Sequence, residues 1–135
     1  MKDCSEKTDN RYEECRQLFF DQLKKESRRI NREIQRELST CRSKMIGFDY
    51  ELAQKKYAEF RRYSRLNMNA FCDVFDAIFG QGTARAESSL ACMIDRKKYE
   101  ISQMELILEE VLKVRRYLKE IGDDSNGEFP GIICK

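Results

Sequence analysis

The sequence lacks histidine and tryptophan altogether, and its single proline is Pro130. Without histidine, the chain has no side chain whose ordinary pKa suits acid–base catalysis near neutral pH. It also contains no Gly-x-Ser-x-Gly nucleophile motif and no phosphate-binding glycine loop. The carboxylate pairs Glu13-Glu14 and Glu109-Glu110 have the character of solubilising charges on helix faces. We therefore expect a protein that is not an enzyme and that needs no cofactor.

Residues that interrupt regular structure are also scarce. Six glycines and one proline leave long tracts without turn signals, whereas a β-sheet protein needs such signals frequently. The sequence therefore predicts an all-α fold. No apolar stretch approaches the roughly 20 residues that a membrane-spanning helix requires, so we expect no membrane span.

An excess of one charge is missing as well, since 26 basic and 24 acidic residues give a formal net charge of +2. This balance argues against broad binding to nucleic acid or to an anionic membrane surface. The basic run at residues 24–29 is interpreted as a solvated helix face, because acids alternate with it at helical spacing. Charged residues make up 37% of the chain, so apolar residues must lie in narrow stripes along elongated helices.

Apolar residues recur every three or four positions in three segments, which predicts helices over about residues 7–43, 49–79 and 86–121. The first stripe consists of Tyr12, Cys15, Phe19, Leu23, Ile30, Ile34, Leu38, Cys41 and Met45. The second consists of Leu52, Tyr57, Phe60, Tyr63, Phe71, Val74, Phe75 and Ile78. The third consists of Ile94, Ile101, Met104, Ile107, Val111, Val114, Leu118 and Ile121. Residues 122–135 are predicted to be a loop-like tail, because they contain glycines, acids and the proline.

These segments predict one domain, residues 1–135, folded as an elongated three-helix antiparallel bundle. Gly47 marks the first turn, and the stretch from Gly80 to Ser89 supplies the second turn and helix caps. A coiled-coil oligomer would need narrower apolar stripes than a bundle helix. We expect the bundle rather than the coiled coil, and hence a monomer.

Six cysteines, an even number in a short chain, indicate a disulfide framework formed in an oxidising compartment. The closest pair is Cys4 and Cys15, so the chain has no Cys-x-x-Cys spacing for a metal or for redox catalysis. We expect a periplasmic or secreted protein, in which Met1 replaces a removed signal peptide. The alternative is that reduced cysteines fill an apolar core in the cytosol.

Antiparallel geometry restricts how the six cysteines pair, although six can pair in about 15 ways. A tight turn near Gly47 places Cys72 level with Cys15, and the third helix brings Cys92 back towards the same end. Three disulfides that stabilise the bundle are therefore predicted: Cys4–Cys92, Cys15–Cys72 and Cys41–Cys134. The rival pairing joins Cys72 to Cys92 directly across the Gly80–Gly82 turn.

Several spaced residues together resemble the LprI-like lysozyme-inhibitor family over about residues 3–107. The matching positions are Cys4 and Cys15, Ile30-Asn31, Ala53-Gln54, Cys72, Gly80-Gln81-Gly82-Thr83 and Cys92. The resemblance implies an exported bacterial helical domain, periplasmic or lipoprotein-anchored, that protects the cell wall from lysozyme. Asn31 and Gln54 have a simpler interpretation too, because buried amides commonly satisfy neighbouring polar groups.

The chain also departs from that family pattern. The family places tryptophan after the glutamine, and here Tyr57 or Tyr63 must take its place. An arginine two turns after the last family cysteine is replaced by Glu100, with Arg96 one turn earlier. The distance from Gln54 to Cys72 is longer than in the family, and Cys41 and Cys134 form an additional pair.

The function predicted from these features is occlusion of a peptidoglycan hydrolase such as lysozyme, whose paired carboxylates lie in a sugar-binding cleft. The candidate partner-binding residues lie in the second turn: Gly80, Gly82, Arg85, Ser88 and Ser89. Glycines allow close approach of the backbone, and an arginine can pair with a catalytic acid. The alternative function is a periplasmic or secreted protein-interaction module, of immunity or adaptor type, with a different protein target.

Overall fold

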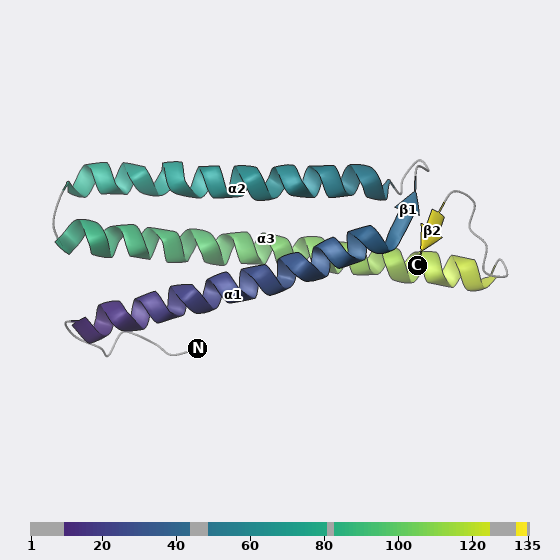
Figure 1. Ribbon diagram of the computed structural model, residues 1–135, viewed down its shortest axis with the longest axis horizontal. Coiled ribbons are helices and arrows are strands. Elements are labelled where there is room, and N and C mark those ends of the chain that lie inside the picture. Colours follow the sequence, from purple (N-terminus) through teal and green to yellow (C-terminus); the bar gives the residue numbers. More distant parts are fainter. Residues whose placement is uncertain (1–9, 44–48, 81–82, 125–131, 135) are drawn as a thin grey trace. The chain divides into compact units, whose positions relative to one another are not determined.

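The computed structural model describes residues 10–43, 49–80, 83–124 and 132–134. Three long helices account for most of them: α1 (Asn10–Thr40), α2 (Tyr50–Phe79) and α3 (Thr83–Asp124), drawn in Figure 1. Two short strands, β1 (Cys41–Ser43) and β2 (Ile132–Cys134), follow α1 and α3. The predicted all-α class is confirmed, as a helical bundle with a disulfide.

Local sequence signals explain both ends of α2. The Asp49 carboxylate accepts a hydrogen bond of 2.9 Å from the Leu52 backbone N–H, which is the geometry of a helix N-cap. At the other end, Gly80 adopts a φ of +67° and donates its N–H to the carbonyl of Asp76 at 3.0 Å. A left-handed residue just past a helix is usually glycine, because glycine has no Cβ to clash. The helix predicted for residues 49–79 is therefore confirmed within one residue.

Helix α1 ends earlier than predicted, because residues 41–43 form β1. Near its end, Ser39 Oγ and Thr40 Oγ1 both donate to the carbonyl of Arg36, at 3.0 and 2.7 Å. Such side-chain bonds compete with the helical backbone pattern and favour a change of conformation. The start of α1 is close to the predicted one, at Asn10.

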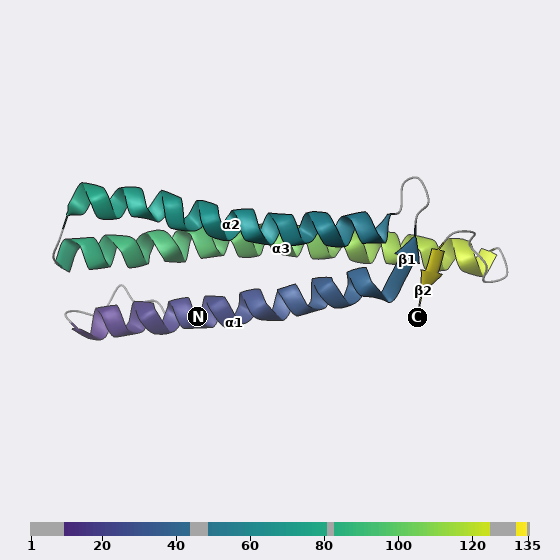
Figure 2. The same cartoon turned by 45° about the horizontal axis from the view of Figure 1, so that its top comes forward.

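Helix α3 is longer than predicted at both ends. It begins at Thr83 and continues to Asp124, so the glycine at position 122 does not terminate it. The predicted tail also contains β2, which pairs antiparallel with β1 in the register Cys41↔Cys134, Arg42↔Ile133 and Ser43↔Ile132. In Figures 1 and 2 the two strands lie side by side. A strand of three residues is too short to show the alternation by which strands are recognised in a sequence.

The chain divides into two compact units, and each contains segments of all three helices. Unit 1 comprises Met1–Arg28 and Tyr63–Ser102. Its contacts Ser64–Glu100, Asn67–Arg96 and Cys72–Cys92 run in opposite directions along α2 and α3, so these segments are antiparallel. The buried residues of unit 1 are Phe20, Leu23, Ser27, Cys72, Cys92, Ile94, Glu100 and Ile101.

Unit 2 comprises Arg29–Arg62 and Gln103–Lys135. Hydrogen bonds from Tyr57 to Asn31 and from Gln54 to Leu38 show that α1 and α2 are antiparallel here. The buried residues of unit 2 are Ile30, Ile34, Glu37, Leu38, Tyr50, Tyr57, Met104 and Leu118. Most of these come from the predicted apolar stripes, which confirms that helical periodicity selects much of the core.

The disulfide in unit 1 joins Cys72 to Cys92, so the predicted bonds Cys15–Cys72 and Cys4–Cys92 are wrong and the rival pairing is right. The physical reason is the tight connection between α2 and α3. Cys72 and Cys92 lie at similar distances before and after that turn, and antiparallel helices place such positions side by side. Their Cα atoms are 5.7 Å apart, within the usual range for a disulfide.

The other cysteines are described in part. Cys15 is disulfide-bonded, and no free cysteine occurs in the part of the chain that the structure describes. Cys4 lies outside that part. Cys41 and Cys134 are direct partners in the β1–β2 register, so the backbone places them opposite each other. The Cys41–Cys134 bond stays a prediction.

Candidate partner-binding surface

The predicted contact residues lie in a turn and in the helix that follows it. Gly80 ends α2, whereas Gly82 lies outside the described residues. Arg85, Ser88 and Ser89 belong to α3. The predicted helix over about residues 86–121 already contained the two serines, whereas Arg85 was expected in the turn, and that expectation is wrong. Helix formation starts earlier than predicted, and only residues 80–82 separate α2 from α3. The side chains of Arg85 and Ser88 are outside the described part, and Ser89 is half-buried.

A second feature of unit 1 is an exposed apolar face on α2. It consists of Tyr63, Leu66, Val74 and Ile78, whose exposed fractions are 62, 50, 56 and 69%. We call these four residues the outer face of α2. Their spacing of three, eight and four positions keeps them on one side of the helix. The face extends to within two residues of Gly80.

Three of these four residues, and Phe71 and Leu52 as well, were predicted to lie in the core, and that prediction is wrong. Helix α2 carries apolar residues on two sides. In unit 1 the inward side is formed by Ser64, Met68, Cys72 and Phe75, which are buried or half-buried. Periodicity identifies a helix with two apolar faces, but it does not say which of them faces the core.

Beside the outer face, α2 and α3 together form a cluster of aromatic and polar side chains around Arg96. The Arg96 guanidinium lies 4.5 Å from the centroid of the Phe71 ring and 5.6 Å from that of Tyr99. Its Nη2 donates a hydrogen bond to Asn67 Oδ1. We call these four residues the Arg96 cluster. Phe71 and Tyr99 remain 45 and 57% exposed, and aromatic residues with arginine are the types that dominate binding energy in protein interfaces.

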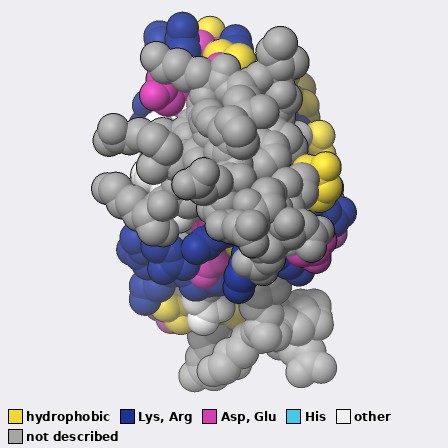
Figure 3. Space-filling view, turned by 90° about the vertical axis from the view of Figure 1, so that its right-hand side faces the viewer, with side chains coloured by type: hydrophobic (Ala, Val, Ile, Leu, Met, Phe, Trp, Pro, Cys, Tyr) yellow, Lys and Arg dark blue, Asp and Glu magenta, His cyan; other side chains and the backbone are white. Residues whose placement is uncertain are grey.

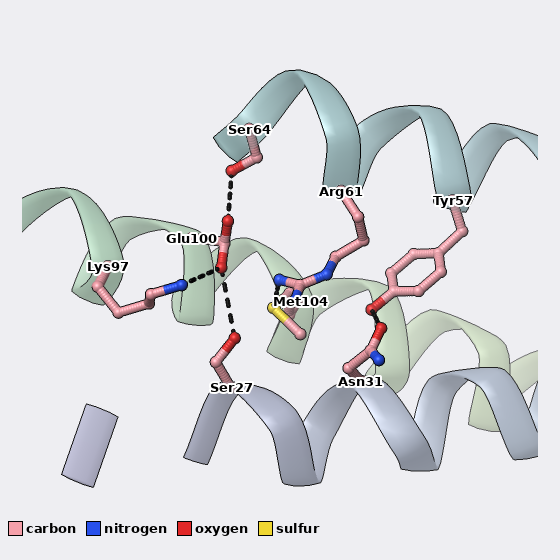
Figure 4. Close-up of polar contacts among 8 residues, drawn as sticks. All are labelled: Ser27, Asn31, Tyr57, Arg61, Ser64, Lys97, Glu100 and Met104. Carbon is pink, nitrogen blue, oxygen red and sulfur yellow. Dashed lines mark hydrogen bonds and ion pairs between the residues drawn. The ribbon is translucent and has the colours of Figure 1, made fainter. Parts of the chain in front are cut away.

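The position where the resembling family has arginine is occupied here by a buried glutamate of unit 1. The Glu100 carboxylate accepts hydrogen bonds from Ser27 Oγ at 3.3 Å, Ser64 Oγ at 2.7 Å and Lys97 Nζ at 3.1 Å (Figure 4). Glu100 is only 4% exposed. Because a buried charge is tolerated only when it is paired and hydrogen-bonded, this group joins the three helix segments of unit 1.

The amide residues of the resemblance have packing roles in unit 2. Tyr57 Oη donates to Asn31 Oδ1 at 2.7 Å, as Figure 4 shows, and Gln54 Nε2 donates to the carbonyl of Leu38 at 2.7 Å. These bonds support the simpler interpretation, in which the amides satisfy neighbouring polar groups. Tyr57 and Tyr63 are the two candidates for the position where the resembling family has tryptophan. Tyr57 is buried whereas Tyr63 is exposed, so only Tyr57 has the surroundings of a core aromatic residue. Arg61 donates to Met104 Sδ at 3.2 Å in the same unit.

Within the described residues, no group of three or more cysteine, aspartate or glutamate side chains could hold a metal ion. None of the helices in that part is long and apolar enough to cross a membrane. No protein-family model, curated protein or solved structure matches this chain. The function must therefore be argued from its own surfaces.

Proposed function

We propose that this chain is an exported lysozyme-inhibitor-like protein, which binds a peptidoglycan hydrolase and occludes its substrate cleft. The observation that carries this proposal is the outer face of α2 beside the Arg96 cluster. Four large apolar side chains there are at least half exposed. Exposed apolar side chains gathered on one side of a helix, next to aromatic and arginine residues, are typical of a protein-binding site.

The structure of unit 1 favours binding as a rigid surface. Cys72 lies on the inward side of α2, and its bond to Cys92 fixes the helix that presents the outer face. Arg96 is already held by Asn67 and by two aromatic rings, so binding would cost little side-chain entropy. A cationic group in this position suits a cleft that contains paired carboxylates.

The remaining parts of the proposal concern architecture and compartment. We infer that the three helices form one elongated antiparallel bundle stabilised by several disulfides, and that the protein acts in the periplasm or outside the cell. The Cys72–Cys92 bond supports an oxidising compartment, where such bonds persist. The opposed positions of Cys41 and Cys134 are compatible with a further bond.

The test is lysozyme-catalysed lysis of bacterial cell walls, titrated with the oxidised protein. We expect saturable inhibition near stoichiometric amounts. The double variant Val74→Ser/Ile78→Ser should lose at least tenfold in inhibitory potency, as should Arg96→Ala. The matched control is Leu106→Ser/Leu112→Ser, which alters exposed apolar residues of α3 in unit 2 and should leave inhibition unchanged.

Two further results bear on the surface. Loss of inhibition after Arg85→Ala, without loss after Asp124→Ala, would extend the contact to the first turns of α3 and exclude the acidic end of that helix. Equal loss in the Val74/Ile78 variant and in the Leu106/Leu112 control would contradict a specific role for the outer face.

The second candidate is a periplasmic or secreted interaction module with another protein target. It is favoured by the net charge of +2, because a weakly basic protein gains no long-range attraction to a basic lysozyme. If several types of lysozyme are unaffected by the protein, hydrolase occlusion is wrong. The outer face of α2 would then be the surface to use in identifying the other partner.

A further inference from the structure

Unit 2 contains an open groove between the C-terminal half of α1 and the N-terminal half of α2. It has a volume of about 500 Å³. Its polar lining comes from Arg32, Gln35, Arg36, Ser39, Gln54 and Tyr57. We call it the Arg32–Arg36 groove. None of the described residues that line it is acidic.

Among the residues that the structure describes, the side chains of the two arginines of this groove have no partner, because the nearby acids of α1 are already engaged. Glu33 pairs with Arg29 at 2.6 Å, and both carboxylate oxygens of Glu37 accept from Arg115 Nη1, at 2.8 and 2.6 Å. No ion pair or hydrogen bond joins the Arg32 or Arg36 guanidinium to another residue in the described part of unit 2. Both side chains are exposed and available to a ligand.

Their spacing makes a bound anion favourable. Residues four positions apart on a helix lie about 5–6 Å apart at Cβ, and like charges there repel each other. Arg32 and Arg36 are such a pair. A single anion with several oxygens can accept hydrogen bonds from both guanidinium groups and thereby remove the repulsion. The lining of the groove identifies Arg32 and Arg36 as its two cations. Figure 3 shows Lys and Arg side chains of one face only by type, without naming residues.

Neutral polar groups complete the site. Gln54 is held in place by the bond from its Nε2 to the carbonyl of Leu38, at 2.7 Å. Tyr57 is likewise fixed by its bond to Asn31. The wall of the groove on α2 is therefore preformed, and it contains no carboxylate. Gln54 keeps a second amide N–H that can donate to an anion, whereas the only hydroxyl hydrogen of Tyr57 is already donated to Asn31.

We propose that the Arg32–Arg36 groove binds a phosphate-type oxyanion, with the dianion of a phosphate monoester as its preferred form. Two unpaired guanidinium groups match two negative charges, whereas a monocarboxylate would neutralise only one of them. This site is independent of the outer face of α2, so its test does not depend on lysozyme inhibition.

The experiment is a titration of the full oxidised protein with glycerol phosphate. Calorimetry and NMR of the arginine side chains measure the binding. We expect saturable binding at one site. The double variant Arg32→Gln/Arg36→Gln should weaken binding at least tenfold. The control Arg62→Gln/Arg65→Gln removes the same charge from exposed positions on α2 and should bind as the unaltered protein does. Equal weakening in both variants would mean a nonspecific charge effect and would overturn the proposal.

Two further measurements examine the ligand chemistry. Acetate should bind at least tenfold more weakly than glycerol phosphate, and phosphate binding should weaken as the pH falls below about 6, where a monoester takes up its second proton. Equal affinity for acetate, or no binding of glycerol phosphate, would overturn the proposal.

Vesicles then distinguish the source of the phosphate. The protein is mixed with vesicles that contain phosphatidic acid and with vesicles of phosphatidylcholine alone. Binding to the first kind only, lost in the Arg32→Gln/Arg36→Gln variant, would mean that the site takes the phosphate of a lipid headgroup. If only free glycerol phosphate binds, the site takes a soluble monoester.

Discussion

Tyr50 is an exception to the rule that buried polar groups are hydrogen-bonded. Its side chain is buried, and its hydroxyl has no hydrogen-bond partner among the residues that the structure describes. Burial raises the pKa of Tyr50 above its ordinary value near 10. Glu37 adds to that rise, whereas Arg115 opposes it. An unsatisfied hydroxyl contributes its desolvation cost without a compensating bond.

We therefore expect Tyr50→Phe to leave the free energy of unfolding unchanged at pH 7, or to increase it. The variant removes only the hydroxyl and keeps the ring in place. Urea denaturation of the two proteins at pH 7 measures the difference. A decrease of more than about 1 kcal/mol would show that the hydroxyl makes a stabilising bond.

The same residue predicts a change of stability in alkaline solution. Above pH 10 the unfolded chain loses the Tyr50 proton, whereas the folded protein keeps it because the pKa is raised. The unfolded state then binds fewer protons, so the free energy of unfolding falls as the pH rises. Tyr50→Phe should make this fall less steep between pH 9 and pH 11. Identical slopes for the two proteins would contradict a raised pKa of Tyr50.

Glu100 is the opposite case, a buried charge that is fully engaged. Removal of its carboxylate by Glu100→Ala leaves Lys97, Ser27 and Ser64 without their common partner. We expect the free energy of unfolding to fall by about 3–5 kcal/mol. The control is Glu110→Ala at a surface pair, for which we expect a change within about 0.5 kcal/mol. Similar losses in both variants would argue against a structural role for the buried group.

At the scale of elements, the Cys72–Cys92 bond determines how α2 and α3 are held in unit 1. The two cysteines are separated by 20 positions in the sequence. Closing a loop of this length lowers the entropy of the unfolded chain and stabilises the folded state by about 3 kcal/mol. We expect Cys72→Ser/Cys92→Ser to lose this amount, as measured by urea denaturation without reductant. An unchanged midpoint would mean that helix packing alone holds this end of unit 1.

Capping chemistry explains why the limits of α2 could be predicted and those of its neighbours could not. Asp49 and Gly80 are strong local signals, and the structure uses both. The glycine at position 122 is a similar signal, yet α3 continues past it. A glycine inside a helix costs only about 1 kcal/mol relative to alanine, so a single glycine does not by itself decide where a helix ends.

Helical periodicity alone was not enough to predict the cysteine pairing or the binding surface. Both require the length of the turn between α2 and α3, which is shorter than the stretch from Gly80 to Ser89 suggested. The Arg96 cluster brings together residues of two helices, and the outer face of α2 has the same spacing as a core stripe. The preference for aromatic and arginine residues at interfaces could have identified Arg96 and Tyr99, but only once the facing positions were known.

At the scale of the whole molecule, the near balance of charge limits how fast a partner is found. With a net charge of +2, long-range steering is weak and rates should depend little on salt. We expect the association rate with lysozyme to change less than about threefold between 50 and 300 mM sodium chloride. Stopped-flow or surface plasmon resonance can measure it. A tenfold fall would show that local charges, such as those of the Arg96 cluster, govern the encounter.

The bond between Cys72 and Cys92 also closes a covalent ring around the turn that contains Gly80. Any peptide bond between these two cysteines can be broken without dividing the molecule. A protease that cuts the turn therefore produces a nicked chain rather than two separate fragments. Its halves would migrate together on a non-reducing gel and separate only after reduction, so cleavage in this turn need not release the helix that carries the outer face of α2.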